Sequence, residues 1–401
     1  MIDQSPPALL VLNAGSSNLK FSLYDAAVPV EAERCLGRGS VEASKGMQRL
    51  VFLGSGDEQE RQAEWPGDHA TSIDDTLSRL MAWIAEAVGC DIVAAAHRVV
   101  HGGDCAEMAM IVTPALMSEM QALSAVAPLH QPKCLAPIDH LARERPGLPQ
   151  FVCFDTVFHR TLDALESRFG LPRTLTDQGL RRYGFHGLSY EYIAGRLIDH
   201  DPYAAHGRTI VAHLGNGASL CGLVNRTSRA TTMGFSTLDG LLMGTRPGRL
   251  DPGILLYLMR ERHMSAKGLE NLLYHHCGLL GVSGGISSDL RELAASAAPQ
   301  AAEAIALFER YVVKEIGAVA AALGGLDALV FTGGVGEHAS DVRNAILDGC
   351  RWLGLERDRD GRQAGTNCLS HPGSAVTAWV IPTDENAVIA RHTLRRLHQA
   401  A

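Results

Sequence analysis

Two stretches of the chain share one pattern of apolar and polar positions. In Leu9–Asp25 an apolar run leads into a turn of small polar residues, and alternating apolar and polar positions follow. Thr209–Asn225 repeats this order about half a chain later. Each stretch predicts two strands joined by a short turn. Because each copy opens its own half of the chain, the pattern predicts a duplicated α/β fold with a cleft between the halves.

The turns of these hairpins suggest a ligand. The first, Asn13–Asn18, offers backbone N–H groups, hydroxyls and amides, with Lys20 two residues beyond it. N–H dipoles beside a cation suit phosphate, although an ordinary β-hairpin with a polar turn explains the same residues. The second turn, Gly215–Ser219, has similar chemistry, and a third glycine-rich strand end lies at Ala328–Glu337. This repetition favours a nucleotide site.

Strands and helices alternate along the rest of the chain, which is typical of an α/β protein. Helical spacing of apolar residues predicts helices at Ser72–Val88, Pro114–Ala127, Pro132–Arg145, Pro252–His263, Leu269–His276, Asp289–Ala297 and Gln300–Leu323. Short apolar runs predict buried strands at Asp91–Val100, Phe151–Asp155, Asp327–Thr332 and Val376–Ile381. The pattern restarts after Ser167, so we expect a domain boundary at Asp155.

Charge and cysteine content restrict the class of protein. The net charge of -8 argues against nucleic acid or an anionic membrane surface as the main partner. Nine cysteines without a CxxC pair are typical of a reducing cytosol. No apolar stretch reaches the roughly 20 residues that span a bilayer. We therefore expect a cytoplasmic protein, whose few lysines and arginines mark any phosphate site.

Three charged residues stand at the ends of predicted elements. Arg98 lies near the end of a strand, where α/β folds bind ligands, although a surface ion pair would also explain it. Asp155 ends a buried strand, where a carboxylate needs a cation or a metal. Glu385 begins the last helix, where it either binds Mg²⁺ or is stabilised by the helix dipole.

Two histidines and an arginine stand in unusual segments. His130 lies between two prolines and belongs either to a site or to a capped connection. His186 is either a core histidine or a donor to phosphate. Ala230–Pro252 is a long loop with four glycines and two prolines, and a loop of this length in a compact domain is usually functional. Arg246 within it is the cation that we expect to face a phosphoryl group.

Two nucleotide-binding signatures are absent from the sequence. The chain has no GxxxxGK[ST] segment, which excludes a P-loop enzyme. No GxGxxG follows a first strand, which argues against a dehydrogenase. A nucleotide site in this chain must therefore be built from other segments.

Eight segments occur along the chain in this order: NAGSSNLKF, HRVVHGG, FDTVFH, RRYGFHGLS, HLGNGAS, TTMGFSTLDGLLMGTRPG, FTGGVGE and IPTDEN. In these segments the chain resembles the acetate kinase family of short-chain acyl-phosphate kinases, over nearly its whole length. The family belongs to the sugar kinase–Hsp70–actin superfamily, so the resemblance implies two duplicated ribonuclease H-like domains with an interdomain cleft. It implies an N-terminal domain of residues 1–155 completed by 386–401, and a nucleotide-binding domain of residues 156–385.

The resemblance implies metal and nucleotide sites. Asn13 and Glu385 would hold Mg²⁺, with Mn²⁺ as an alternative, and Asp155 would lie near the metal and the acyl group. ATP or ADP would be the co-substrate. The residues along the phosphate path and around the nucleotide would be Ser16, Asn18, Lys20, Asn216, Gly217, Asp289, Leu290, Arg291, Gly334, Val335 and His338.

The resemblance also implies catalytic roles. Arg98 and Arg246 would bind the carboxylate and the phosphoryl group. His186 would donate a hydrogen bond to the phosphoryl group during its transfer. His130 would join these catalytic residues. A carboxylate that attacks a γ-phosphate is an anion approaching an anion, so positioning and charge neutralisation dominate this chemistry. The acyl pocket would consist of Val100, Leu129, Phe185 and Thr237.

Five positions depart from the family pattern. His338 stands where Asn is usual, and Arg249 stands where the loop usually has Asp. Leu188 and Tyr190 replace the more familiar Thr and His. Thr237 stands where Pro commonly lines the acyl pocket. No departure removes a charged catalytic position, but Thr237 leaves the preferred acyl-chain length open.

The resemblance implies a homodimer that reversibly transfers the γ-phosphoryl of ATP to acetate, giving acetyl phosphate and ADP. Val100 indicates a small pocket, but one methylene is worth only about 1–3 kcal/mol, so a propionate or butyrate kinase is an alternative. A non-catalytic nucleotide-binding relative is a second alternative. Such a relative would have a helix-turn-helix before the first strand and would lack the catalytic cations. In this chain the first strand begins by Leu9, and the cations are present.

Overall fold

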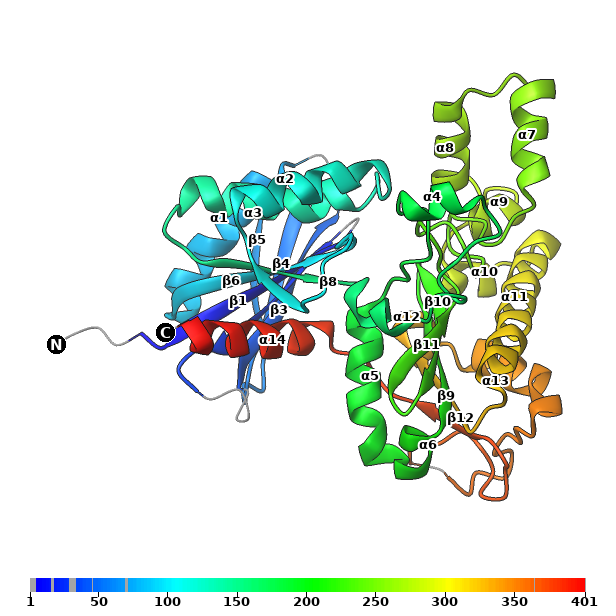
Figure 1. Cartoon of the computed structure of the whole chain (residues 1–401). Helices are drawn as coiled ribbons and strands as arrows, with labels where there is room; N and C mark the ends of the chain where they lie inside the picture. Colours follow the sequence, from blue (N-terminus) through cyan, green and yellow to red (C-terminus); the bar gives the residue numbers. More distant parts are fainter. Residues whose placement is uncertain are drawn as a thin grey trace. The chain divides into compact units, whose positions relative to one another are not determined.

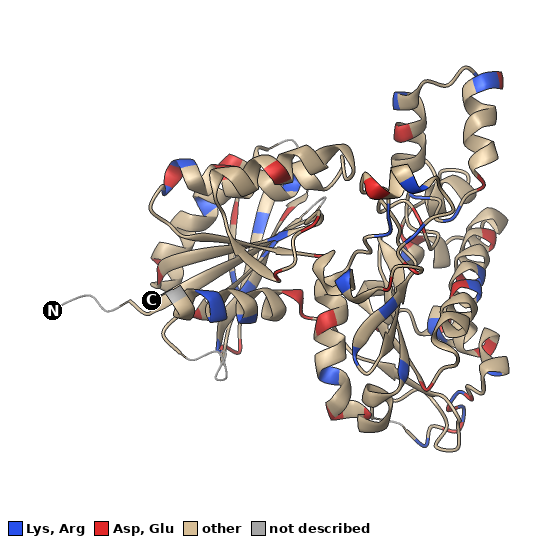
Figure 2. Ribbon diagram, viewed as in Figure 1, with Lys and Arg blue, Asp and Glu red and all other residues tan. Residues whose placement is uncertain are grey.

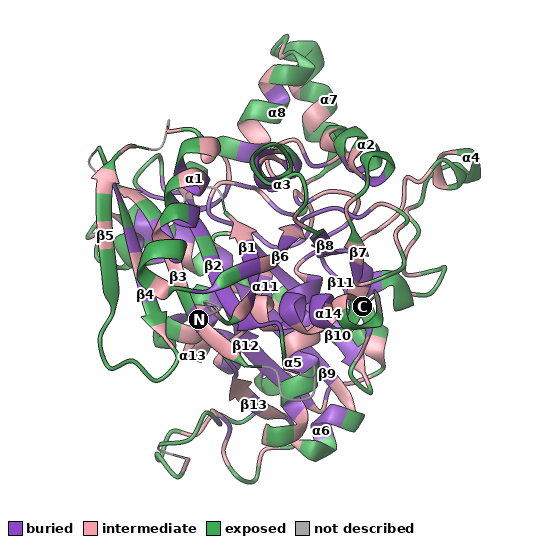
Figure 3. Ribbon diagram, turned by 90° about the vertical axis from the view of Figure 1, so that its left-hand side faces the viewer, coloured by how far each residue is buried: buried purple, intermediate pink, exposed green. Residues whose placement is uncertain are grey.

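The computed structural model describes residues 5–15, 18–28, 34–44, 46–68, 71–363 and 365–400. The chain divides into two compact units. Unit 1 consists of Met1–Val157 and Asp384–Ala401, and unit 2 consists of Phe158–Thr383. Each unit contains one sheet with helices packed against it (Figure 1). Buried residues gather in the strands of both sheets (Figure 3).

The described strands of unit 1 form a sheet in the order β5-β4-β3-β2-β1-β6-β8-β7. β1 to β5 pair antiparallel, whereas β6 is parallel to both β1 and β8. In the first hairpin Asn13 lies opposite Lys20. The bounds are β1 (Pro7–Ala14), β2 (Asn18–Asp25), β3 (Cys35–Ser44), β4 (Met47–Gly54), β5 (Arg61–Pro66), β6 (Asp91–Val99), β7 (Ala109–Ile111) and β8 (Gln150–Phe154).

The described strands of unit 2 repeat this order. Its sheet runs β11-β10-β9-β12-β13, with the first three strands antiparallel and β12 parallel to β9 and β13. The same sequence of directions occurs across β3-β2-β1-β6-β8, which confirms the predicted duplicated α/β fold. The bounds are β9 (Arg208–Leu214), β10 (Ala218–Val224), β11 (Thr227–Thr231), β12 (Ala328–Thr332) and β13 (Thr377–Val380).

Helices pack on both faces of the unit 1 sheet (Figure 1). Leu77 and Leu80 of α1 join the core with Leu10 and Phe21 of the first hairpin. α14 contacts β1, β6 and β7, so the C-terminal segment completes the unit. The bounds are α1 (Ile73–Trp83), the π-helical turn η2 (Ile84–Val88), α2 (Pro114–Ala122), η3 (Leu123–Ala125), α3 (Gln131–Glu144) and α14 (Glu385–Ala400).

In unit 2, α5 and α11 lie on opposite sides of the sheet (Figure 1). Ile193 and Leu197 of α5 pack with Val211 and Val330 of the central strands. None of the described helices combines the length and apolar character needed to cross a bilayer. The bounds are η4 (Val157–Thr161), α4 (Arg173–Asp177), α5 (Gly187–His200), α6 (Pro202–His206), α7 (Pro252–Glu261), α8 (Ala266–His275), α9 (Gly278–Val282), α10 (Leu290–Ala294), α11 (Pro299–Leu323), α12 (Gly333–His338), α13 (Ser340–Gly349) and η5 (Arg351–Leu353).

The sequence-based elements need correction at α5 and at α12. α5 was not among the predicted helices, and the glycine-rich strand end at Ala328–Glu337 continues into the short helix α12. Glycine has a low helix propensity. Here the Glu337 carboxylate accepts hydrogen bonds from the Gly333 N–H at 2.9 Å and from the Thr332 hydroxyl at 3.3 Å. These bonds close a helical turn that propensity alone does not predict.

Candidate active site

In unit 1, four predicted site residues come together at one edge of the sheet. β1, β6 and β8 are parallel neighbours, so Asn13, Arg98 and Asp155 lie at their carboxyl ends, and Glu385 begins α14 beside them. Arg98 Nε and Nη2 donate to the two Asp155 carboxylate oxygens at 3.0 and 2.5 Å. Asn13 Nδ2 donates to Glu385 Oε2 at 2.9 Å. These four residues are called the unit 1 cluster below.

The unit 1 cluster is a buried ionic network. The side chain of Asp155 is 1% exposed and that of Arg98 is 15% exposed, so the surface ion pair that was the alternative for Arg98 is wrong. Burial alone lowers the pKa of Arg98, but Asp155 and Glu385 outweigh burial and raise it above its ordinary value. With two carboxylates to one guanidinium, the cluster favours an additional cation.

The donor atoms of this cluster are compatible with magnesium. Carboxylate and amide oxygens are the hard ligands that Mg²⁺ prefers, and Mg²⁺ commonly binds one or two carboxylates while it keeps several waters. Asn13 Oδ1 already lies 3.4 Å from Arg98 Nη1. Within the described ranges no group of three His, Cys, Asp or Glu residues could enclose a metal.

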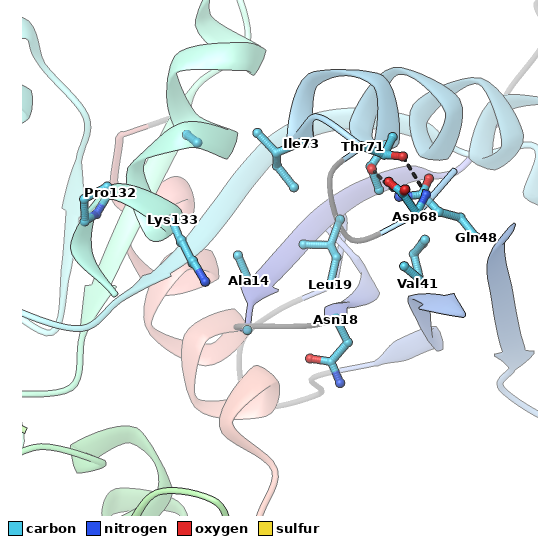
Figure 4. A pocket seen from close by; sticks show the side chains of 14 residues that line it. Ala14, Asn18, Leu19, Val41, Gln48, Asp68, Thr71, Ile73, Pro132 and Lys133 are labelled. Carbon is cyan, nitrogen blue, oxygen red and sulfur yellow. Dashed lines mark hydrogen bonds between the residues drawn. The ribbon is translucent and has the colours of Figure 1, made fainter. Parts of the chain in front are cut away.

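The turn of the first hairpin borders a cavity of about 380 Å³. Gly15 and Asn18 line it from the turn, and Lys133 of α3 extends toward Ala14 (Figure 4). Lys133 is a further exposed cation near the residues that are predicted to bind phosphate. The sequence did not indicate Lys133 as a site residue, because it lies on an amphipathic helix. Lys20 is also exposed. Ser16 lies outside the described residues.

In unit 2, the turn between β9 and β10 meets the long loop 232–251, which has no helix or strand. The Gly244 N–H donates to the Asn216 carbonyl at 3.1 Å and joins the loop to the turn. A Cβ added to Gly217 would lie 2.7 Å from Arg246 Nη2 and 3.5 Å from His186 Nε2. The Arg246 guanidinium and the His186 imidazole therefore both lie beside Gly217, where the side chain can be no larger than a hydrogen atom.

Arg246 is a buried cation without a carboxylate partner among the described residues. Its side chain donates from Nη1 to the Thr237 carbonyl at 2.7 Å. The residue is 7% exposed, and burial lowers the pKa of Arg246 to about 10, with Tyr274 acting in the opposite direction. A buried charge is costly unless it is paired. The position therefore suits an anionic ligand.

His186 is held in an uncommon backbone conformation. It precedes α5 with φ 58° and ψ 23°, the left-handed region that few non-glycine residues adopt. Its Nδ1 lies 2.8 Å from Ser219 Oγ, and its ring stacks on that of His213 at 4.3 Å between centroids. His186 is half-buried, so it is not a core histidine. Ser219 and His213 had no assigned role, although both belong to the HLGNGAS segment.

The predicted adenosine residues fall into two groups. Gly334 and Val335 belong to α12, which follows β12, and β12 is parallel to β9. They therefore lie at the same sheet edge as Asn216 and Gly217. Asp289, in contrast, caps α10 and is bonded to Arg291. No hydrogen bond or ion pair between described residues joins these two groups, which also include Leu290 on α10 and His338 at the end of α12.

The Acetokinase family model matches residues 8–391 of the chain. The chain belongs to the acetokinase family. An acetate kinase from Rhodopseudomonas palustris is 49% identical over 391 residues, which are 96% of this chain and 98% of that protein. The structure of Porphyromonas gingivalis acetate kinase is 32% identical with a TM-score of 0.81, over 98% of this chain and 100% of that one. A Francisella tularensis propionate kinase is 32% identical with a TM-score of 0.85, over 96% and 98% of the two chains.

The remaining candidates in this acetokinase-family chain are divided between the units. Val100 is buried directly after β6, and Leu129 and His130 immediately precede α3. Phe185 and Thr237 belong to unit 2, where their carbonyls accept hydrogen bonds from His159 and Arg246. The acyl-pocket assignment of these residues stays a prediction.

Proposed function

We propose that the protein reversibly transfers the γ-phosphoryl of ATP to the carboxylate of acetate, forming acetyl phosphate and ADP. The observation that carries this proposal is Arg246, a buried guanidinium that no described carboxylate neutralises. It lies with His186 Nε2 beside Gly217, where a phosphoryl group would meet both donors. Family membership and relatives named acetate kinase support the same activity.

In the proposed reaction an acetate oxygen attacks the γ-phosphorus, and the bond from that phosphorus to the oxygen of the leaving ADP breaks. No covalent enzyme intermediate is required. Arg246 and His186 donate to the phosphoryl oxygens, where charge accumulates in the transition state. Arg98 uses three N–H groups in its described bonds. A guanidinium has five, so two are left for the acetate carboxylate.

We propose that the unit 1 cluster holds Mg²⁺ through oxygens of Asn13 and Glu385, with Asp155 nearby. The ion would neutralise phosphate charge when it is bound. Asn216 and Gly217 would meet the nucleotide phosphates, as expected of a turn at the carboxyl ends of strands.

Propionate or butyrate is the second candidate acceptor. The propionate kinase from Francisella tularensis is among the similar structures, and Thr237 departs from the usual residue of the acyl pocket. A comparison of kcat/KM for acetate, propionate and butyrate separates the candidates. We expect acetate to have the highest value and propionate a lower but measurable one.

We also propose that the protein is a homodimer that associates through α7. None of the residues of this helix is buried. Ile254, Leu256, Tyr257 and Met259 are each 44–53% exposed. Charged residues occur only at its C-terminal end (Figure 2). An uncharged apolar helix of this kind needs a partner surface, and a second copy is the partner implied by the family resemblance.

The activity is tested by following ATP consumption with acetate and trapping the acyl phosphate with hydroxylamine. We expect acetate-dependent turnover that yields acetyl hydroxamate. Arg246→Gln should lower kcat by at least two orders of magnitude with an unchanged Tm, because it removes the buried charge. Arg249→Gln, which changes a more exposed arginine of the same loop, is the matched control. A wild-type protein without acetate-dependent turnover, or a fully active Arg246→Gln, would contradict the proposal.

A further inference from the structure

A chain of hydroxyl groups connects the core of unit 2 to His186. Ser219 Oγ lies 2.8 Å from His186 Nδ1 and 2.5 Å from the Tyr190 phenol oxygen. Local structure explains the arrangement. His186 caps α5, and the Tyr190 N–H one turn into that helix donates to the His186 carbonyl at 3.0 Å. Ser219 lies opposite His213 in the β9–β10 pair, and His213 stacks on the His186 ring.

The direction of each hydrogen bond follows from the available acceptors. Tyr190 is fully buried, and among the described residues its hydroxyl has no hydrogen-bond partner other than Ser219. Burial raises the pKa of Tyr190 well above its ordinary value, so the phenol keeps its proton. Tyr190 must therefore donate to Ser219. The Ser219 proton is then directed to His186 Nδ1, its other side-chain partner.

An acceptor role for Nδ1 determines the form of the His186 ring. A neutral imidazole that accepts at Nδ1 carries its proton on Nε2. If Nδ1 carried a proton, Ser219 would accept hydrogen bonds from both Nδ1 and Tyr190, because a hydroxyl oxygen has two lone pairs. The proton of the fully buried Ser219 would then have no acceptor among the described residues, which is costly. Nε2 is the atom that converges with Arg246 beside Gly217.

We propose that Ser219, which accepts from Tyr190 and donates to Nδ1, is a positioning residue that keeps His186 as the neutral Nε2–H tautomer. The ring then presents an N–H donor, and not a lone pair, to an anion beside Arg246. The catalytic consequence rests on the proposed function, whereas the tautomer does not. Tyr190 stands where the acetate kinase pattern has His, so this hydroxyl chain depends on a residue that departs from the pattern.

The test is long-range ¹H–¹⁵N NMR of the full chain with ¹⁵N-labelled histidine, without substrates, at about pH 8, where an ordinary histidine is neutral. Loss of a signal in His186→Gln identifies the ring. We expect the Nε2–H pattern in the wild type. In Ser219→Ala, Nδ1 loses its hydroxyl donor, so a substantial Nδ1–H population should appear. Tyr190→Phe leaves the bond from Ser219 to Nδ1 in place and should keep the Nε2–H pattern. Tyr192→Phe removes a hydroxyl from the same helix without altering the partners of Ser219 and should leave the spectrum unchanged.

Kinetics of the same variants test the consequence. Ser219→Ala should lower kcat about tenfold with KM values within twofold, whereas Tyr192→Phe should leave kcat unchanged. The wild-type spectrum keeps the test available if Ser219→Ala does not fold. A wild-type Nδ1–H tautomer, or unchanged ¹⁵N shifts in Ser219→Ala, would overturn the proposal, as would altered shifts with unaltered kcat. An inactive wild type with the expected tautomer would instead refute only the proposed function.

Discussion

Two buried arginines in this protein have opposite electrostatic surroundings. Arg98 lies against Asp155 and Glu385, which raise the pKa of Arg98 despite its burial. Arg246 has a backbone carbonyl as its hydrogen-bond partner, and burial lowers the pKa of Arg246 to about 10. The native fold therefore holds Arg98 in place by itself, whereas Arg246 gains its full stabilisation only when an anion binds.

Gly217→Ala tests whether the nucleotide phosphates bind in the space beside Arg246. The added methyl would lie 2.7 Å from Arg246 Nη2 and would displace the guanidinium. We expect kcat/KM for ATP to fall at least tenfold with a Tm within a few degrees of the wild type. Gly195→Ala is the matched control, because a Cβ at this exposed helical position meets nothing within 4 Å. A Gly217→Ala protein with kcat/KM within twofold of the wild type would disprove this use.

Glu385 allows a test of the metal proposal. Its carboxylate accepts a hydrogen bond from Asn13 and lies 3.8 Å from Arg98. Glu385→Ala removes one of the hard oxygen ligands proposed for Mg²⁺, so the Mg²⁺ concentration for half-maximal activity should rise several-fold. Titration of activity with MgCl₂ measures this. An unchanged titration curve would leave Glu385 with only its role at the start of α14.

At the scale of elements, parallel strands gather the candidate site in each unit. β1, β6 and β8 end at one edge in unit 1, and β9 and β12 end at one edge in unit 2. β6 contributes Arg98 to that edge and also carries His97 into the core, where the residue is 1% exposed. His97 Nε2 donates to Gln150 Oε1 of β8 at 2.8 Å, and Nδ1 has no hydrogen-bond partner among the described residues.

Burial therefore makes β6 sensitive to acid. It lowers the pKa of His97 from 6.5 to about 4, with Gln150 acting in the opposite direction. As the pH falls, His97 is protonated in the unfolded chain before it is protonated in the native protein. The native protein therefore has its full stability above pH 6.5 and loses stability as the pH falls toward 4. The free energy of unfolding should fall by at most about 1.4 kcal/mol per pH unit for this group. Urea unfolding of wild type and His97→Gln should show a shallower slope for the variant between these pH values. Equal slopes would contradict the assignment.

At the scale of the whole molecule, the five described strands of unit 2 match β3-β2-β1-β6-β8 of unit 1 in order and direction, and unit 2 also carries the α7–α8 hairpin. Figure 1 shows the two helices projecting from the rest of that unit. Since α7 has no buried residue, intramolecular packing does not explain its apolar sequence. Association of two copies would bury this surface, which is the reason for the proposed homodimer.

Leu256→Glu should convert the dimer to a monomer, because it puts a charge into the centre of the proposed interface. Light scattering after size exclusion should give a mass near 42.9 kDa for the variant and twice that value for the wild type. Leu165→Glu, at a residue of unit 2 that is 84% exposed, should remain dimeric. A monomeric wild type, or a dimeric Leu256→Glu, would refute the interface.

Local patterns predicted most elements but few of the contacts of the candidate site. Both hairpins and the long loop are readable from spacing and turn chemistry. The helical form of Gly333–His338 depends on Glu337, whose contacts are not visible in a propensity pattern. Lys133 reaches the cavity from a helix that pairs with the hairpin only in the folded unit.

The sequence by itself determined the duplicated order of strands, the polar turns that end them and the charged residues available for chemistry, because these depend on the periodicity and composition of short segments. Only the tertiary structure decided that Asp155 neutralises Arg98 whereas no described carboxylate neutralises Arg246, and that Tyr190 reaches His186 through Ser219. The physical reason is that charge state and hydrogen-bond direction depend on burial and on partners that are distant in sequence.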